Sequence, residues 1–309
     1  MKPSVYVRTV AIISAVILSA FGSVVGQHEH QRQEDTAIRL RTELVSLHVL
    51  VTDQSGRALL GFRKEDFRVY EDKVEQRISF FSADESPVSW GLILDRSGSM
   101  MGMMRDVYRA ALHVIDEGTD QDEMFVVTFN DRVEIVSDFA SDRHRMENSL
   151  LGLRADGQTA LWDAVAFGLD HIKRGKNRKK VIVVVTDGED NASHASFRSL
   201  VERVEEGDVL IYSVGMFESG MRTGGDAARL ELEKLAQATG ARAHFPSDIE
   251  QCREAMKEIA REVSQQYVIG YYPTNTAQDG KWRKIQIRVG SHTARTRAGY
   301  YAPAAKEAK

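Results

Sequence analysis

Cysteine is nearly absent from this chain of 309 residues, in which Cys252 is the only one. A single cysteine excludes a disulfide within the chain, so stability has to come from packing. Cys252 lies on a helical stripe with Ile249, Met256, Ile259 and Val263. That spacing predicts a small buried apolar residue rather than a reactive thiol.

Several sequence signatures of enzymes are also missing. The chain has no Gly-x-x-x-x-Gly-Lys-Ser/Thr phosphate loop, no Gly-x-Ser-x-Gly nucleophile elbow and no histidine pair of the kind that binds a catalytic metal. No Gly-x-Gly-x-x-Gly follows the first strand predicted for the middle of the chain, which disfavours a dinucleotide-binding enzyme. The common nucleotide-dependent and hydrolytic enzyme classes are therefore not indicated.

Neither sign of charge dominates the composition. The chain has 41 Lys and Arg against 45 Asp and Glu, giving a formal net charge of -4. This balance does not indicate a polyanionic partner, and we expect no nucleic-acid binding. A hydrophobic content of 42% and a charged content of 28% are typical of a folded globular protein. The length favours one full domain plus a smaller one.

The N-terminus has the layout of an export signal. Lys2 and Arg8 precede an uncharged stretch whose apolar centre is Val10–Leu18. A positive segment before a short apolar one is typical of secretory signals. We therefore predict that residues 1–26 are a signal peptide or, if uncleaved, an N-terminal membrane anchor, which would be the protein's only attachment to a membrane. The protein is expected to be periplasmic, secreted or associated with the cell envelope.

Short alternating apolar runs, broken by turn residues, occur before residue 88 and again after residue 264. Such runs predict strands, but neither set completes a sheet by itself. We therefore predict a small β-sandwich made of residues 36–87 and 265–303, with two separate β modules as the alternative. Residues 27–35 and 304–309 are expected to be flexible. The predicted strands are Val45–Val51, Phe67–Tyr70, Gln76–Phe81, Gln266–Tyr272, Lys284–Val289 and Thr293–Gly299.

Residues 88–264 alternate strands with helices. This pattern predicts a doubly wound, Rossmann-like α/β domain, with helices on both faces of a mostly parallel sheet, inserted in or flanked by the β-sandwich. Val181–Val185 is a continuous β-branched run, as expected of a central strand. The predicted strands are Val88–Asp95, Met124–Phe129, Val133–Val136, Val181–Thr186, Val209–Val214 and Ala243–Phe245, and the predicted helices lie near Met103–Glu117, Thr159–Lys173, Ser196–Glu205, Ala227–Ala238 and Ile249–Val263.

Oxygen-bearing side chains follow three of these strands. Asp95, Ser97 and Ser99 alternate on a turn after the first strand, Thr159 opens a helix, and Asp187 closes the central strand. In a doubly wound sheet, ligands bind at the loops beyond the carboxyl ends of the strands. Two carboxylates and three hydroxyls without His or Cys suit Mg²⁺ or Mn²⁺, with Ca²⁺ as a further candidate, and argue against zinc.

At these five residues the sequence resembles the von Willebrand factor type A family, whose metal-ion-dependent adhesion site reads Asp-x-Ser-x-Ser, then Thr, then Asp after a buried strand. The resemblance covers about Pro87 to Val263. Each residue alone is weak evidence for such a site, because Ser and Thr also cap helices and Asp also ends strands. The order of segments along the whole chain resembles exported bacterial proteins related to this family.

Two further groups of residues each have two alternative interpretations. Asp163, Asn130, Glu189 and Asp190 flank the five residues and are expected either to support the metal ligands or to cap helices. The basic run Lys173–Lys180 follows a predicted helix end, where cations suit the helix dipole, and is expected to be a solvated face rather than an anion site.

The resemblance implies a non-enzymatic module that captures an acidic side chain of a partner protein through the metal. Mg²⁺ with a few direct hydroxyl ligands remains electron-poor and can take an Asp or Glu from outside in place of a water. The alternative is a Mg²⁺-dependent hydrolase or phosphoryl-transfer enzyme that uses the same pocket. Ser97 or Ser99 would then need a neighbouring base to act as a nucleophile, which the sequence does not indicate.

Overall fold

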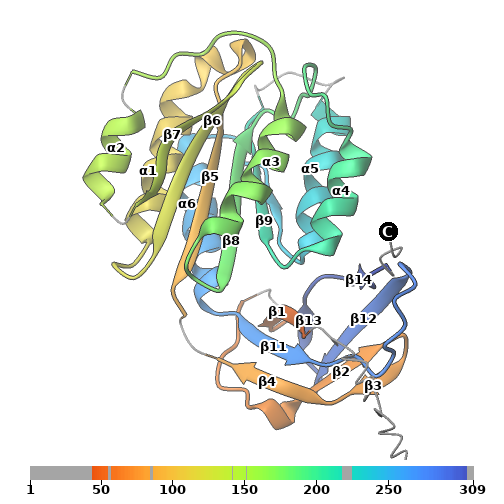
Figure 1. Ribbon diagram of the computed structural model, residues 1–309. Helices are drawn as coiled ribbons and strands as arrows, with labels where there is room; N and C mark the ends of the chain where they lie inside the picture. The colour runs from red at the N-terminus through yellow and green to blue at the C-terminus, as the bar shows by residue number, and fades with distance from the viewer. Residues whose placement is uncertain are drawn as a thin grey trace, which may run out of the picture. The chain divides into compact units, whose positions relative to one another are not determined.

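A computed structural model describes residues 44–54, 57–83, 86–140, 142–150, 152–217 and 225–304 (Figure 1). The predicted export segment 1–26 and the predicted flexible segment 27–35 lie outside the described residues. Of the predicted tail, only Ala304 is described. Within the described ranges, no helix combines the length and the apolar character needed to cross a membrane.

The middle of the chain forms a six-stranded sheet in the order β10-β9-β8-β5-β6-β7. Neighbouring strands pair in parallel except β7, which runs antiparallel to β6. The prediction of a mostly parallel sheet is therefore confirmed. The strand predicted at Val133–Val136 is longer, because β7 continues along β6 as far as Ala140. The strands are β5 (Val88–Asp95), β6 (Glu123–Phe129), β7 (Val133–Ala140), β8 (Lys179–Thr186), β9 (Leu210–Gly215) and β10 (Ala243–His244).

Helices cover both faces of this sheet, as predicted. Alternate residues of β5 enter different cores, because a strand points successive side chains to opposite faces: Leu92 and Leu94 pack on the α1, α2 and α6 side, and Ile93 packs on the α3, α4 and α5 side. Cys252 is buried in the first core, where burial raises the pKa of its thiol to about 11. The helices are α1 (Met104–Glu117), α2 (Arg143–Leu150), α3 (Leu161–His171), α4 (Phe197–Glu206), α5 (Gly225–Thr239) and α6 (Ile249–Ser264), with short 3-10 turns η2 (Gly98–Gly102) and η3 (Ile172–Arg174).

Helix α2 was not predicted from the sequence. Its eight residues are mostly polar, and Met146 and Leu150 are buried in the core. Their i, i+4 spacing is the sole helical signal, and it is too short to recognise as a periodic pattern.

The remaining strands form two four-stranded antiparallel sheets, in the orders β13-β1-β11-β4 and β14-β12-β2-β3. Each sheet combines strands from before and after the α/β region, since β1 pairs with β11 and β2 pairs with β12. Side chains of both sheets share one apolar core, which includes Leu47, Val69 and Ile285. The strands are β1 (Val45–Thr52), β2 (Phe67–Glu71), β3 (Val74–Gln76), β4 (Ile78–Ser82), β11 (Tyr267–Tyr271), β12 (Trp282–Val289), β13 (Thr293–Arg295) and β14 (Gly299–Tyr301), with a 3-10 turn η1 (Lys64–Asp66).

Two of the predicted strands prove to be pairs of strands that pass from one sheet to the other. The run Gln76–Phe81 contains the end of β3 and most of β4, which belong to different sheets. The run Thr293–Gly299 likewise begins with β13 and ends where β14 starts. Alternating polarity does not distinguish one long strand from two short strands on either side of a sheet corner.

The prediction that the basic run Lys173–Lys180 is a solvated face is wrong for Lys179. Its side chain is buried, and its Nζ donates to the backbone oxygen of Val263, 2.9 Å away, at the end of α6. Lys180 Nζ turns back to the backbone oxygens of Gly175 and Asn177. These contacts satisfy backbone carbonyls in the last turn of α6 and in the loop after η3, so these two lysines have a structural role.

We expect residues 36–87 not to fold alone. Of strands β1 to β4, only β2 and β3 pair with each other, whereas β1 and β4 depend on β11. A two-stranded hairpin is at best marginally stable. Circular dichroism of the isolated segment should show no cooperative melt, and co-expression with residues 265–303 should increase its solubility. A monomeric fragment that unfolds cooperatively would contradict this architecture.

Candidate metal site

Asp95 stands at the carboxyl end of β5, the strand between β8 and β6. Its side chain is fully buried. One carboxylate oxygen accepts the backbone N–H of Ser97 at 2.8 Å, and the other accepts the hydroxyl of Thr186 at 2.6 Å. The first bond folds the chain back after the strand, and the second fixes the carboxylate against β8. Asp95 is therefore held in one orientation.

Ser97 and Ser99 lie on the turn that follows. Their hydroxyl oxygens are 3.0 Å apart, with Ser97 buried and Ser99 exposed. Between them, the backbone N–H of Gly98 donates to the oxygen of Gly157 at 3.0 Å. A Cβ on Gly98 would come within 3.3 Å of that same oxygen, so a residue without a side chain suits the close approach of the two loops.

Thr159 is buried on the loop before α3 and is tied to the loop after β8. Its backbone N–H donates to Oδ1 of Asn191 at 2.9 Å, and its backbone oxygen accepts the N–H groups of Asn191 and Ala192. Asn191 is exposed, so its side chain acts on the loop rather than in the core. These bonds place the Thr159 loop against the loop that carries Asp187.

Asp187 follows β8 directly and is almost completely buried. Thr186, the residue before it, both donates to Asp95 and accepts the N–H of Gly188 at 3.0 Å. Gly188 has a φ of +83°, which a residue with a side chain rarely adopts. Thr186 thus connects the two carboxylate-bearing loops, and sequence analysis missed it.

Ionising the buried carboxylate of Asp95 is electrostatically unfavourable. Burial raises its pKa to about 6, hydrogen bonds from Thr186 and Ser97 lower it, and the charge of Asp187 raises it further. Near neutral pH the loops therefore hold a buried anion next to a second carboxylate. A cation placed there would offset both the desolvation and the repulsion.

The five residues predicted as ligands thus belong to three loops that are bonded directly to one another. Their oxygens form a hard donor set suited to a divalent cation such as Mg²⁺. Among the described residues, no three His, Cys, Asp or Glu side chains gather into a cluster that could hold a metal. Any cation here would depend on the hydroxyls as well as on the two carboxylates.

The flanking polar residues connect loops. Asp163 accepts the backbone N–H groups of His194 and Ala195, each at 2.9 Å. Asp190 accepts the hydroxyl of Ser193 at 2.5 Å, which fixes the same loop. These contacts favour the supporting role over direct ligation.

Asn130 has a comparable position at the end of β6. Its Nδ2 donates to Asp156 at 2.9 Å, and its Oδ1 accepts the N–H of Arg132. Its backbone oxygen also accepts the N–H of Ala160, next to Thr159. Glu189 is exposed and its N–H lies 3.4 Å from Asp187.

Residues 91–261, more than half of the chain, match the family model described as von Willebrand factor type A domain. A solved structure with a similar fold is the von Willebrand factor type A protein from Catenulispora acidiphila, with a TM-score of 0.51 and 16% identity, covering 71% of this chain and 66% of that one. The hypothetical protein BatB from Bacteroides thetaiotaomicron aligns over 57% of this chain and 97% of its own, with 15% identity and a TM-score of 0.48.

One curated relative is similar in sequence. The uncharacterized protein sll0103 of Synechocystis sp. is 33% identical over 108 residues, or 34% of this chain. The aligned part spans about a quarter of that relative, 26% of its length.

Proposed function

Because this chain belongs to the von Willebrand factor type A domain family, we propose that it is a non-enzymatic module that binds a protein partner through a divalent metal ion, most suitably Mg²⁺. The observation that carries the proposal is the buried Asp95 carboxylate beside Asp187, on loops that also present hydroxyl oxygens. Asp95, Ser97, Ser99, Thr159 and Asp187 would hold the ion. When bound, it would supply a Lewis-acidic position for an Asp or Glu oxygen of the partner.

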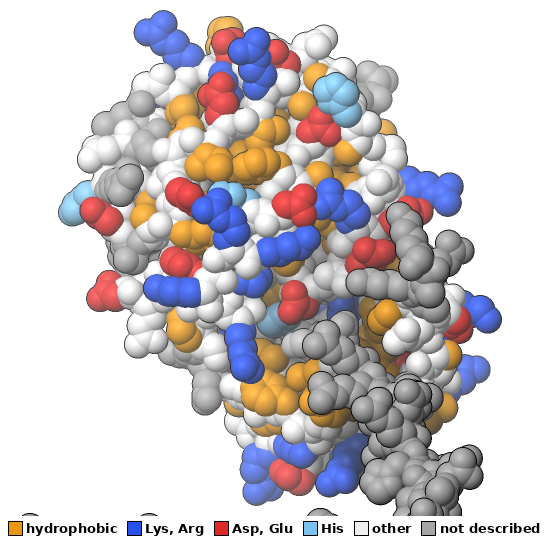
Figure 2. All heavy atoms as spheres, in the orientation of Figure 1, with side chains coloured by type: hydrophobic (Ala, Val, Ile, Leu, Met, Phe, Trp, Pro, Cys, Tyr) orange, Lys and Arg blue, Asp and Glu red, His pale blue; other side chains and the backbone are white. Residues whose placement is uncertain are grey.

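The chain's own residues provide orientation and rigidity. Thr186 and the Ser97 N–H keep the Asp95 carboxylate fixed, and the bond from Gly98 to Gly157 keeps two of the loops together. Loops on a rigid parallel sheet are a common place for binding residues. On the face seen in Figure 2, basic and acidic side chains are interspersed rather than separated by sign, which supports a protein partner over a polyanion.

We also propose that the protein acts outside the cytoplasm. The support for this is the sequence of residues 1–26, with two positive residues before an apolar stretch. Sequencing the N-terminus of the protein recovered from a cell-envelope fraction tests it. Recovery of the full-length chain from the cytosol alone would contradict export.

Thermal unfolding with Mg²⁺ and with EDTA tests the binding proposal. Saturating Mg²⁺ should raise the melting temperature, since a ligand at 100 times its Kd stabilises the native state by about 2.7 kcal/mol. Thr159→Ala removes one neutral hydroxyl and should weaken the response without abolishing it. Thr119→Ala, an exposed threonine in another loop, is the matched control and should behave as wild type.

Partner binding should follow the same pattern. Capture from native cell envelope should retain proteins in Mg²⁺ and release them in EDTA. An identical set of captured proteins in both buffers, or an unchanged melt with Mg²⁺, would contradict the proposal. Turnover of phosphoester or ester substrates that needs Asp95 would instead support the alternative, a Mg²⁺-dependent enzyme.

A further inference from the structure

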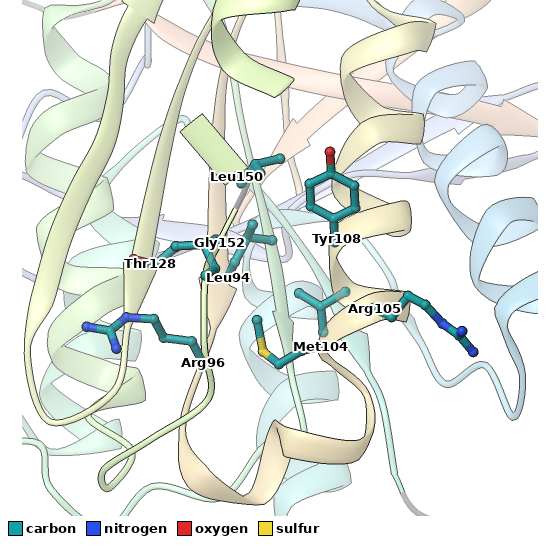
Figure 3. A pocket seen from close by; sticks show the side chains of 10 residues that line it. Leu94, Arg96, Met104, Arg105, Tyr108, Thr128, Leu150 and Gly152 are labelled. Carbon is teal, nitrogen blue, oxygen red and sulfur yellow. The ribbon is translucent and has the colours of Figure 1, made fainter. Parts of the chain in front are cut away.

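A pocket of about 250 Å³ lies beside the first loop of the candidate metal site (Figure 3). Its walls come from the end of β5, from the first two turns of α1, and from the end of α2 with the residues that follow it. Leu94, Met104, Tyr108, Leu150 and Leu153 are among the residues that line it. The interior is therefore apolar.

The pocket and the metal site share one stretch of chain. Leu94 and Arg96 line the pocket, and Asp95 stands between them. Consecutive Cα atoms are about 3.8 Å apart, so the backbone positions that carry the pocket wall directly neighbour the one that carries the metal-site carboxylate, although successive side chains point in different directions. A single short segment of a partner could reach both, because an extended chain advances about 3.3 Å per residue.

The charged residues of the pocket do not face its interior. In Figure 3 the guanidinium groups of Arg96 and Arg105 point away from the pocket, and only their stems line it. Arg96 is already paired with Asp156 and Glu134. Arg105 is exposed. A basic group beside an apolar pocket complements a partner that carries acidic and apolar residues together.

One hydroxyl inside the pocket wall also lacks a partner. Thr128 lies on β6, is fully buried, and its Oγ1 has no hydrogen-bond partner in the described part of the chain. A buried unpaired hydroxyl costs free energy, and proteins rarely keep one without a reason. Among large apolar side chains, only one with a polar atom, such as Tyr or Trp, would satisfy it.

The volume limits what the pocket holds. Pockets for cofactors and drug-sized ligands measure roughly 300–1,000 Å³, so this one is small for them. It suits a single large side chain. Met101, two residues beyond Ser99, is 71% exposed and extends the apolar surface from the metal-site loop itself.

We propose that this pocket is the second half of the partner site, and that it takes a large aliphatic or aromatic side chain lying within about three residues of the acidic residue that binds the metal. The inference rests on the proposed function, because it assumes an acidic partner at Asp95 and its neighbours. It adds that the partner is recognised by a pair of side chains, one acidic and one apolar.

Selection of displayed random peptides on the immobilised full chain in Mg²⁺, with elution by EDTA, tests the pairing. The expected result is a set of peptides that share Asp or Glu and, within three positions, Leu, Met, Phe, Tyr or Trp. Acidic peptides with no apolar preference would overturn the inference and leave the proposed function standing. Failure to select any peptide released by EDTA would overturn both.

A selected peptide then allows a double-mutant cycle. Replacing its apolar residue by Ala should weaken binding to wild type about tenfold or more. Leu153→Trp, which fills the pocket, should weaken the parent peptide similarly and leave the Ala peptide unaffected, with Mg²⁺ affinity unchanged. Leu230→Trp places the same change on an exposed leucine of α5 and should alter neither.

A readout on the wild-type protein does not depend on the variants folding. With methionine methyl groups labelled, the parent peptide should shift the signal of Met104 in the pocket, and the Ala peptide should shift it much less. Met256, buried on α6, is the internal control and should stay in place. Equal effects of both peptides on Met104 would overturn the inference.

Discussion

Asp95→Asn is expected to weaken Mg²⁺ binding severely and at the same time to stabilise the metal-free protein at neutral pH. Asn keeps the shape of the side chain and its Oδ1 can still accept the N–H of Ser97, while its Nδ2 faces the Thr186 hydroxyl as a donor, as a protonated Asp95 would. It removes the buried negative charge on which the cation would depend. Loss of one of two anionic ligands should lower Mg²⁺ affinity by about 100-fold or more.

The stability change follows from the raised pKa of Asp95, about 6 against an ordinary value of 3.8. Between these values the native state holds the proton more tightly than the unfolded chain, so wild-type stability falls as pH rises from about 4 to 6. The difference of 2.2 corresponds to about 3 kcal/mol, at 1.36 kcal/mol for each unit of pKa. Asn does not titrate and avoids this loss.

Denaturant unfolding in EDTA at several pH values measures the effect. Wild type and Asp95→Asn should have similar free energies of unfolding near pH 4, and the variant should be more stable by up to about 3 kcal/mol at pH 7.5. Mg²⁺ should stabilise only wild type. Asp120→Asn, at an exposed aspartate, is the control and should show neither change. Unaltered Mg²⁺ affinity by calorimetry in Asp95→Asn would end the assignment of the site.

Long strands and local motifs were predictable because each is encoded in a short stretch of sequence. The run Val181–Val185 is apolar and β-branched, and it indeed lies in β8 between two parallel neighbours. Asp95 and Asp187 could be placed together because they follow the parallel strands β5 and β8, whose carboxyl ends meet at one edge of the sheet, whereas Thr159 follows the antiparallel β7 and helix α2. Position in the fold thus followed from strand order and chain direction.

The connections between the loops were not predictable in the same way. Thr186 hydrogen-bonds Asp95 across 91 positions of sequence, and nothing in the local pattern identifies that partner. The sequence indicates the role of Thr186 only through its position before Asp187, on a strand next to β5. Lys179 was likewise assigned to a surface because its environment depends on α6, which lies far along the chain. Long-range polar contacts of this kind require the fold to be known.

Glu262→Ala should be among the most destabilising substitutions of a charged residue in this chain. Glu262 is buried near the end of α6, where it accepts the hydroxyl of Tyr212 at 3.1 Å and pairs with Arg295 of β13. Arg242 also approaches it at 3.6 Å. Removing the carboxylate leaves a mostly buried guanidinium and a buried phenol without their acceptor.

The expected loss in free energy of unfolding is about 3 kcal/mol, since breaking one partner of a buried pair leaves the other uncompensated. Glu262→Gln keeps an acceptor for Tyr212 and should lose about half as much. Glu254→Ala provides the matched control two turns earlier on α6: Glu254 is exposed where it pairs with Arg253 and Lys257, so the loss should stay within about 0.5 kcal/mol. Urea unfolding of the three variants measures this order.

The double variant Glu262→Leu with Arg295→Met separates the cost of a broken pair from the value of the pair itself. Replacing both charged groups by apolar ones should recover most of the lost stability. Mg²⁺ affinity should be unchanged in every folded variant, because Glu262 contacts Tyr212, which pairs with Val183, four residues or about 13 Å along β8 from Asp187. A double variant as unstable as Glu262→Ala would show that the ion pair itself joins α6 to the β-sandwich.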